Sequence, residues 1–178
     1  MENRDLFFDR LQGNFSNDAI KRIGDAYRLA KDIHRDQRRE GGERYFEHPR
    51  SVALIIFDEL NIYDEEMVIV SLLHDCLEDG WLRPESIEKL FGERIVQMLL
   101  ALSKFTVREE NGKILKVKRH DYLEKLLEAD WKTRVVKLCD RLHNLRTLGV
   151  CSSDKRSRVY HETDMVYMPL AQKTSRPL

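Results

Sequence analysis

Residues 65–79, with the sequence EEMVIVSLLHDCLED, decide how the rest of the chain is interpreted. Their first part is apolar on all sides rather than along one stripe, which is typical of a helix buried at the centre of a fold. We therefore predict a central helix over residues 65–77. Its end collects four ionisable side chains, namely His74, Asp75, Glu78 and Asp79. On a helix His74 shares a face with Glu78, and Asp75 shares one with Asp79. Because burying such groups without partners is costly, a metal ion or a polar network should satisfy them.

The adjacent His74 and Asp75 offer one imidazole nitrogen and one carboxylate oxygen from a single turn. This donor set suits a hard or borderline divalent ion such as manganese, iron, magnesium or zinc. Two other segments carry candidate ligands: His48 at the start of a helix, and Asp140 late in an apolar run. Each also has a simpler interpretation. His48 could be a surface residue or a helix cap, and Asp140 could pair with a neighbouring cation such as Lys137.

Outside this segment, apolar residues recur mostly at helical spacing, and alternating strand patterns are scarce. The pattern predicts an all-α fold, with helices over residues 16–38, 48–60, 65–77, 83–91, 93–102, 120–129, 132–148 and 155–171. Residues 103–118 are polar and contain Asn111-Gly112, a turn signal. We expect a loop there, or a short hairpin.

The composition describes a soluble globular chain of 178 residues, with 42% hydrophobic and 35% charged residues. Lys plus Arg and Asp plus Glu number 31 each, so no overall basic field exists to recruit nucleic acid. The three cysteines, Cys76, Cys139 and Cys151, form neither a disulfide framework nor a Cys-x-x-Cys metal motif. Neither a signal peptide nor a membrane-spanning run is apparent. We expect a cytoplasmic protein without nucleic-acid or membrane partners, and the sequence does not determine its oligomeric state.

The order of the candidate ligands, His, then His-Asp, then Asp, resembles the HD superfamily of phosphohydrolases. Four segments narrow the resemblance to the hydrolase domain of the RelA/SpoT family: RYFEHP at residues 44–49, HDCLED at 74–79, KLCDRLHNLRTL at 137–148 and ETDMVYMPLA at 162–171. The similarity extends from about residue 26 onward, and the third segment is too long to arise readily by chance.

This resemblance implies an HD-domain helical bundle around a single metal site. It implies that the metal, usually manganese in this family, is held by His48, His74, Asp75 and Asp140. It also implies acid–base roles for Glu78 and Asp79, contact with the guanine base for Arg39, and contact with the nucleotide for Asn144 and Thr147.

The reaction implied by the resemblance is hydrolysis of the 3′-pyrophosphate of ppGpp or pppGpp, which yields GDP or GTP plus pyrophosphate. The expected partner is therefore a guanosine polyphosphate. We expect one HD phosphohydrolase domain over residues 1–178, with its core at about 20–172 and without the synthetase domain of the family's long members.

Several positions depart from the family pattern. Glu40 replaces a basic residue, Arg44 stands where proline is usual, Gly80 where threonine is common and Cys139 where alanine is common. These changes leave the expected ligands in place but bear on substrate identity. A second hypothesis is therefore an HD phosphohydrolase acting on another nucleotide or phosphoester. A third is a non-catalytic module that senses the alarmone or binds a partner.

Overall fold

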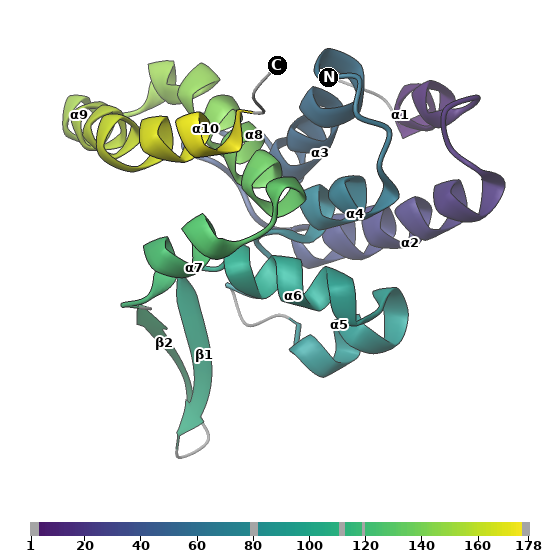
Figure 1. The fold of residues 1–178 in the computed structure, drawn as a ribbon, viewed down its shortest axis with the longest axis horizontal. Coiled ribbons are helices and arrows are strands. Elements are labelled where there is room, and N and C mark those ends of the chain that lie inside the picture. The colour runs from purple at the N-terminus through teal and green to yellow at the C-terminus, as the bar shows by residue number, and fades with distance from the viewer. Residues whose placement is uncertain (1–3, 79–81, 111–112, 119, 176–178) are drawn as a thin grey trace.

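The computed structural model describes residues 4–78, 82–110, 113–118 and 120–175, and nearly all of its regular elements are helical (Figure 1). The α-helices are α1 (Arg4–Leu11), α2 (Asn17–Ile33), α3 (Glu47–Leu54), α4 (Glu65–Leu73), α5 (Pro84–Phe91), α6 (Glu93–Leu102), α7 (Tyr122–Glu128), α8 (Trp131–Arg146), α9 (Ser153–Glu162) and α10 (Met168–Thr174). Two π-helical segments, η1 (Ile55–Glu59) and η3 (Thr163–Tyr167), and one 3₁₀ turn, η2 (Leu148–Val150), continue them. The predicted all-α class is confirmed.

Helix α4 forms the centre of the core. Every side chain from Met67 to Leu73 is buried, and the helix packs against α2, α3, α6 and α8. This arrangement leaves no solvent-facing stripe beyond the first turn and confirms the central position predicted from the apolar segment. The start of α3, the end of α4 and the middle of α8 therefore lie close together.

Side-chain caps determine where several helices begin. Ser16 accepts a hydrogen bond from the amide of Ala19 at the start of α2, and Asp64 accepts one from Met67 at the start of α4. Each cap satisfies an amide that has no partner within the helix.

Two predicted helices end earlier than expected. Helix α2 ends at Ile33 rather than near residue 38, after which the chain turns and residues Arg38 and Arg44 form an isolated antiparallel bridge. Between them Gly42 adopts a φ of +83°, in the left-handed region that favours glycine. The predicted helix over 65–77 ends at Leu73, so residues 74–78 form a turn, and His74 and Glu78 are not neighbours on one helical face. The turn starts with a short-range hydrogen bond of 2.9 Å from the amide of Cys76 to the carbonyl of Leu73.

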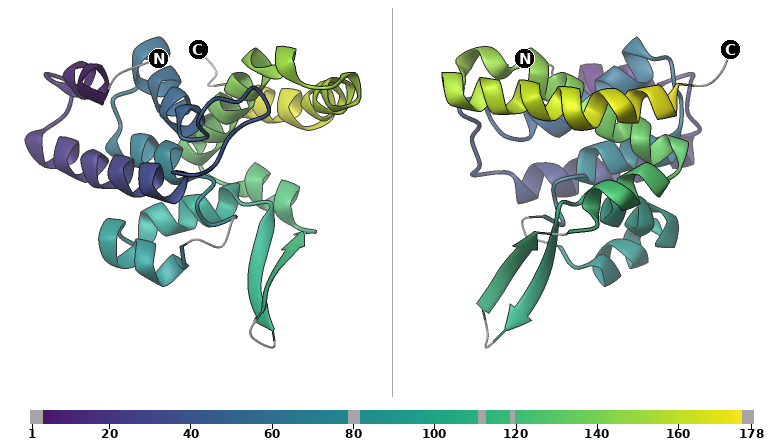
Figure 2. Two further views of the ribbon diagram at one scale, coloured as in Figure 1. Left: turned by 180° about the vertical axis from the view of Figure 1, so that it is seen from behind. Right: turned by 60° about the vertical axis from the view of Figure 1, so that its left-hand side comes forward.

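Residues 103–118, for which a loop or a short hairpin was expected, contain a hairpin. Strand β1 (Phe105–Glu110) pairs antiparallel with β2 (Lys113–Lys118), with Phe105 opposite Lys118. The hairpin projects from the helical body in all views (Figures 1 and 2). Asn111 and Gly112, which suggested the turn, lie outside the described residues.

Helix α1 was not predicted from the sequence, yet it contributes to the core. Phe7 and Leu11 are fully buried. The centroid of the Phe7 ring lies 5.4 Å from that of Phe57 and 5.1 Å from that of Tyr27. These aromatic contacts join the N-terminal helix to α2 and η1.

The helix predicted over residues 155–171 is continuous but changes its pitch (Figure 2, right). It consists of α9, the π-helical η3 and α10. Pro169 has no amide hydrogen and therefore cannot donate to a carbonyl in the preceding turn. Helix α10 packs against α8, which supports the C-terminal side of the site.

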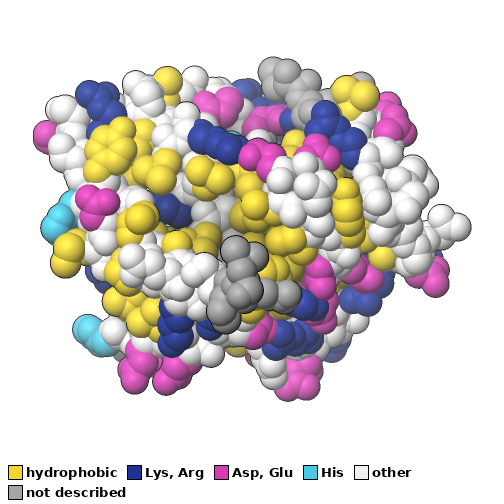
Figure 3. Space-filling view, turned by 45° about the horizontal axis from the view of Figure 1, so that its top comes forward, with side chains coloured by type: hydrophobic (Ala, Val, Ile, Leu, Met, Phe, Trp, Pro, Cys, Tyr) yellow, Lys and Arg dark blue, Asp and Glu magenta, His cyan; other side chains and the backbone are white. Residues whose placement is uncertain are grey.

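The surface agrees with the balanced composition. On the face turned forward in Figure 3, acidic and basic side chains are interspersed with hydrophobic ones. Within the part of the chain that the structure describes, no helix combines the length and the apolar character needed to cross a bilayer.

Candidate metal centre and adjoining cleft

Three of the four expected metal ligands converge in the interior. His48 comes from the first turn of α3, His74 follows the last turn of α4, and Asp140 lies on α8. The His48 Nε2 atom is 3.2 Å from His74 Nε2 and 3.1 Å from Asp140 Oδ1, and the donor atoms of the three residues all lie within 4.8 Å of one another. All three side chains are buried. Two imidazole nitrogens and a carboxylate oxygen at this spacing could hold a divalent metal ion.

The fourth expected ligand, Asp75, lies beside this group. Its Oδ2 atom is 3.2 Å from His74 Nε2 and 3.9 Å from His48 Nε2. The same oxygen accepts a 2.7 Å hydrogen bond from the hydroxyl of Tyr45. Asp75 is therefore oriented by Tyr45 and adds a second negative charge to the cluster.

Asp140 uses its two oxygens for different partners. Oδ2 lies 2.9 Å from the ammonium of Lys137, and Oδ1 accepts a 2.6 Å hydrogen bond from Asn144 while facing His48. The position of Asp140 is thus compatible with both interpretations, an ion pair with Lys137 and a metal ligand. Burial alone would raise the pKa of Asp140, but the Lys137 charge and the hydrogen bond with His48 hold this pKa well below its usual value.

The rings of the two histidines have their own partners outside the cluster. His74 Nδ1 lies 2.8 Å from the carbonyl oxygen of Ser71, and His48 Nδ1 lies 2.8 Å from Nδ1 of His143. Burial alone would lower the pKa of His74, but Asp75 and Asp140 raise it to about 9, as expected where carboxylates favour positive charge. Burial, together with the charges of His48 and Arg39, lowers the pKa of His143 to about 3, so that ring is neutral.

Glu78, the first of the two expected acid–base residues, follows the cluster at the end of the same turn. Its carboxylate accepts a hydrogen bond from the backbone amide of Lys104, between α6 and β1. Burial raises the pKa of Glu78 above its usual value. Asp79, the second expected residue, lies outside the described residues.

A cleft opens beside the cluster. One cavity of about 390 Å³ is lined by His48, Asp75, Glu78 and Asp140 together with basic side chains, and a second of about 250 Å³ shares part of this lining. Both cavities are lined by the same four cations, Arg39, Lys104, Lys137 and Lys155. A concave site that places positive charge next to a potential metal centre suits a phosphorylated ligand.

The expected nucleotide-contacting residues lie together in this cleft. The guanidinium of Arg39 donates to Asn144 Oδ1 at 2.8 Å and to Thr147 Oγ1 at 3.3 Å. The Arg39 side chain is only 17% exposed and pairs with Glu43 at 3.5 Å, so it is not a freely solvated surface charge.

Four residues near the site were not assigned a role from the sequence: Tyr45, Lys104, His143 and Lys155. Tyr45 and His143 stand inside segments that carry the family resemblance, so their place in those motifs was a usable signal. Lys104 and Lys155 lie in polar stretches without a distinguishing pattern, and only the fold brings them to the cleft.

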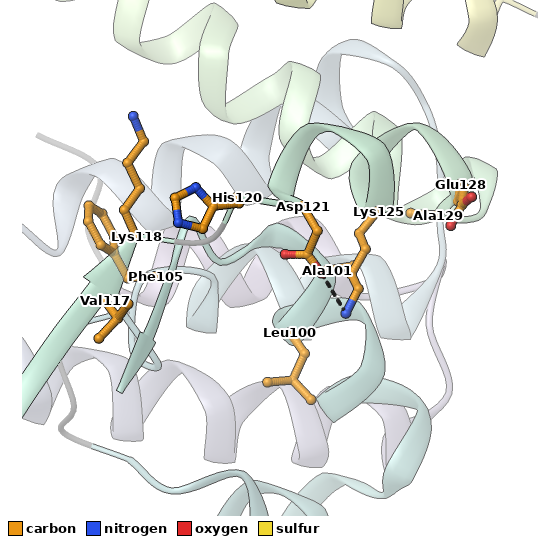
Figure 4. A pocket seen from close by; sticks show the side chains of 10 residues that line it. All are labelled: Leu100, Ala101, Phe105, Val117, Lys118, His120, Asp121, Lys125, Glu128 and Ala129. Carbon is orange, nitrogen blue, oxygen red and sulfur yellow. Dashed lines mark ion pairs between the residues drawn. The ribbon is translucent and has the colours of Figure 1, made fainter. Parts of the chain in front are cut away.

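A larger groove of about 800 Å³ lies elsewhere, between the base of the hairpin, α6 and α7 (Figure 4). Leu100, Phe105 and Val117 form part of its lining, and Lys125 pairs with Asp121 at 2.9 Å along its wall. None of the described residues that line it belongs to the expected site. We therefore place the candidate site at the cluster and not at the larger cavity.

The chain is similar to known proteins over most of its length. It is 40% identical over 158 residues to "GTP pyrophosphokinase rsh" of Brucella melitensis, a match that covers 87% of this chain and 20% of that protein. It is 36% identical over 166 residues to "Bifunctional (p)ppGpp synthase/hydrolase SpoT" of Escherichia coli, which covers 92% of this chain and 23% of that protein. The chain thus spans about a fifth of the length of these relatives.

A solved structure and a family model agree on the fold. The structure, described as "A metazoan ortholog of SpoT hydrolyzes ppGpp and plays a role in starvation responses", superposes with a TM-score of 0.64 at 24% identity. The superposition covers 86% of this chain and 83% of that one, and it supports the fold. The model of the HD domain matches residues 26–175, which include the whole cluster of His48, His74 and Asp140. The chain therefore belongs to the HD domain family.

Proposed function

We propose that this chain is a metal-dependent phosphohydrolase that removes the 3′-pyrophosphate of ppGpp or pppGpp, leaving GDP or GTP. The proposal rests on the juxtaposition of a buried histidine–aspartate cluster with a cleft in which four basic side chains line both cavities. The relatives named for (p)ppGpp synthesis and hydrolysis support the choice of substrate.

In this proposal His48, His74, Asp75 and Asp140 hold one divalent ion, which we propose is Mn²⁺. When bound, such an ion lowers the pKa of a water molecule and polarises the phosphoryl group. Two neutral imidazoles and two carboxylates offset its double charge. Tyr45 and Lys137 orient the two carboxylates from outside the cluster, which fixes the oxygens that face inward.

Glu78 is the proposed general base or acid. Its carboxyl group lines the cleft, and a pKa raised by burial brings the group closer to the range in which it can exchange protons at neutral pH. The amide of Lys104 holds one of its oxygens in place. We propose that Asp79, next in the chain, relays the proton.

Arg39, Asn144 and Thr147 are the proposed contacts of the guanosine end, since they form one hydrogen-bonded group beside the cluster. Lys104 and Lys155 lie where they can neutralise phosphate oxygens in the same cleft. Their ammonium groups pair with Glu162 at 2.9 Å and with Glu40 at 2.7 Å, respectively.

The Glu40–Lys155 pair favours one alternative substrate class. An acidic residue that binds a cleft lysine reduces the positive charge available to phosphates, so a nucleotide with fewer phosphates is the second candidate substrate.

The deciding experiment follows ppGpp by anion-exchange chromatography, using protein treated with chelator and then loaded with Mn²⁺. We expect conversion to GDP plus pyrophosphate, with no conversion in chelator and none in Asp140→Ala. Absence of turnover when Mn²⁺ is demonstrably bound would count against the proposal.

A nucleotide panel separates the two substrate classes. If ppGpp and pppGpp are cleaved faster than nucleotides without a 3′-pyrophosphate, the alternative is rejected. Glu40→Gln sharpens the comparison, because freeing Lys155 should lower the KM for the more highly phosphorylated substrates. Glu59→Gln is the control, since Glu59 forms an exposed pair with Arg146 that lies outside the cleft lining.

A further inference from the structure

His143 lies between an arginine of the cleft and a histidine of the metal centre. Its Nδ1 atom is 3.3 Å from Arg39 Nη1 and 2.8 Å from His48 Nδ1, and the two imidazole centroids are 4.9 Å apart. The residue follows Asp140 by one turn of α8 and is partly buried. The Arg39 guanidinium and the His48 imidazole thus both approach Nδ1 of His143. The hydrogen-bonding chemistry of the arginine determines which of these nitrogen atoms carry protons.

The position of the ring proton on His143 follows from Arg39. A guanidinium nitrogen can donate hydrogen bonds but cannot accept them. His143 Nδ1 is therefore the acceptor, and the neutral ring carries its proton on Nε2. His48 Nδ1 faces the same atom at 2.8 Å, so it must carry a proton, because two unprotonated nitrogens at this distance would set lone pair against lone pair.

The proton on His48 Nδ1 leaves its Nε2 atom unprotonated, because a neutral imidazole has a single N–H. That Nε2 atom is the one 3.2 Å from His74 Nε2 and 3.1 Å from Asp140 Oδ1. His74 directs Nδ1 at the carbonyl of Ser71, so its Nε2 atom also faces the cluster. Both rings therefore point Nε2 into the cluster. A metal ligand must present an unprotonated nitrogen, and hydrogen bonds to the opposite ring nitrogen fix which one it is.

We propose that His143 is a positioning residue that holds His48 in its metal-binding tautomer, and that Arg39 sets the tautomer of His143. The inference rests on the metal centre of the proposed function but not on the identity of the nucleotide. It gives Arg39 a second role, since the side chain that contacts Asn144 and Thr147 in the cleft also governs a metal ligand. Activity measurements alone would not separate these roles, so neither test uses a substrate.

The first test needs no variant. Long-range ¹H–¹⁵N correlation spectra of the full, ¹⁵N-labelled chain after chelator treatment report which ring nitrogen carries the proton. We expect His48 to be protonated on Nδ1 and His143 on Nε2. A spectrum with His48 protonated on Nε2, or with His143 protonated on Nδ1, would overturn the proposal.

The second test compares two substitutions of His143 by their affinity for Mn²⁺ alone, measured from the electron paramagnetic resonance signal of the free ion. His143→Asn keeps an acceptor oxygen near the position of Nδ1, whereas His143→Leu removes it at similar size. We expect His143→Leu to weaken Mn²⁺ binding by roughly 10–100-fold, the usual effect of losing such a partner. We expect His143→Asn to restore most of that affinity.

The control is His161→Leu, an exposed histidine on α9, which should bind Mn²⁺ as the unmodified chain does. If His143→Leu folds and keeps full affinity, or if His143→Asn binds as weakly as His143→Leu, the proposal is wrong. Should His143→Leu fail to fold, the tautomer spectrum of the unmodified chain still decides. Because neither measurement contains a nucleotide, failure to cleave ppGpp would leave both results interpretable.

Discussion

At the scale of single residues, the site is a set of buried charges that compensate one another. Lys137 and Asp140 are 8% and 10% exposed and lie 2.9 Å apart, so neither is solvated by bulk water. Two histidines and a second aspartate adjoin them. Burying an ion pair costs desolvation energy. Removing one partner leaves an uncompensated buried charge, which destabilises the folded state far more than removing one partner of an exposed pair does.

Substitution of Lys137 by Met should therefore destabilise the chain strongly when metal is absent. The unpaired Asp140 carboxylate would cost roughly 3–5 kcal/mol. A divalent cation in the cluster should recover part of this loss, because it replaces the missing positive charge. Urea unfolding in chelator and in Mn²⁺ measures both values.

Lys125→Met is the matched control for that prediction. Lys125 pairs with Asp121 across 2.9 Å, but the two side chains are 56% and 43% exposed. Such a pair contributes only about 0–1 kcal/mol, with or without metal. Equal destabilisation of Lys137→Met in chelator and in Mn²⁺ would show that its charge does not act on the metal centre.

At the scale of elements, α4 supports both the core and the site. The helix is buried along its length after the first turn, and it ends immediately before His74. Any shift of α4 therefore moves a candidate ligand. The turn over residues 74–78 then places Asp75 against Tyr45 and Glu78 against the amide of Lys104.

Leu72→Ala should destabilise the chain by roughly 2–5 kcal/mol, because Leu72 is fully buried and its truncation leaves a cavity. Chemical denaturation of the metal-free protein measures this difference in the free energy of unfolding. Leu90→Ala on α5 serves as the comparison, since that leucine is 61% exposed and should cost far less. Equal losses for the two variants would contradict the central position of α4.

At the scale of the whole molecule, the cluster joins parts of the chain that are distant in sequence. His48 and Asp140 are 92 positions apart, yet His48 Nε2 and Asp140 Oδ1 lie 3.1 Å from each other. The unfolded chain cannot hold these donors together. A metal ion that binds the assembled cluster, and not the unfolded chain, therefore stabilises the folded state.

Mn²⁺ should accordingly raise the melting temperature, and chelator should lower it. At a free ion concentration 100 times the dissociation constant, the stabilisation should be about 2.7 kcal/mol. Differential scanning calorimetry across a Mn²⁺ titration measures the effect. The rise should vanish in His48→Ala and persist in His161→Ala, so a rise that survives in His48→Ala would place the ion elsewhere.

Patterns in the sequence alone predicted the all-α class, which the structure confirms, and they proposed the residues of the site, which stay a prediction. The apolar segment before His74 predicted the central helix, and the turn signal within residues 103–118 was compatible with the hairpin. These features depend on local periodicity and turn chemistry, which a single sequence displays directly.

Which groups face one another depends on how the helices pack in the folded chain. Helix α4 ends at Leu73, and the Tyr45 hydroxyl donates to Asp75, because packing against other helices overrides the local helical pattern. The same holds for Lys104, His143 and Lys155, whose neighbours are 26 to 115 positions away in the chain. Hydrogen bonds and charges act over a few ångströms in space, so their partners become visible only once the chain has folded.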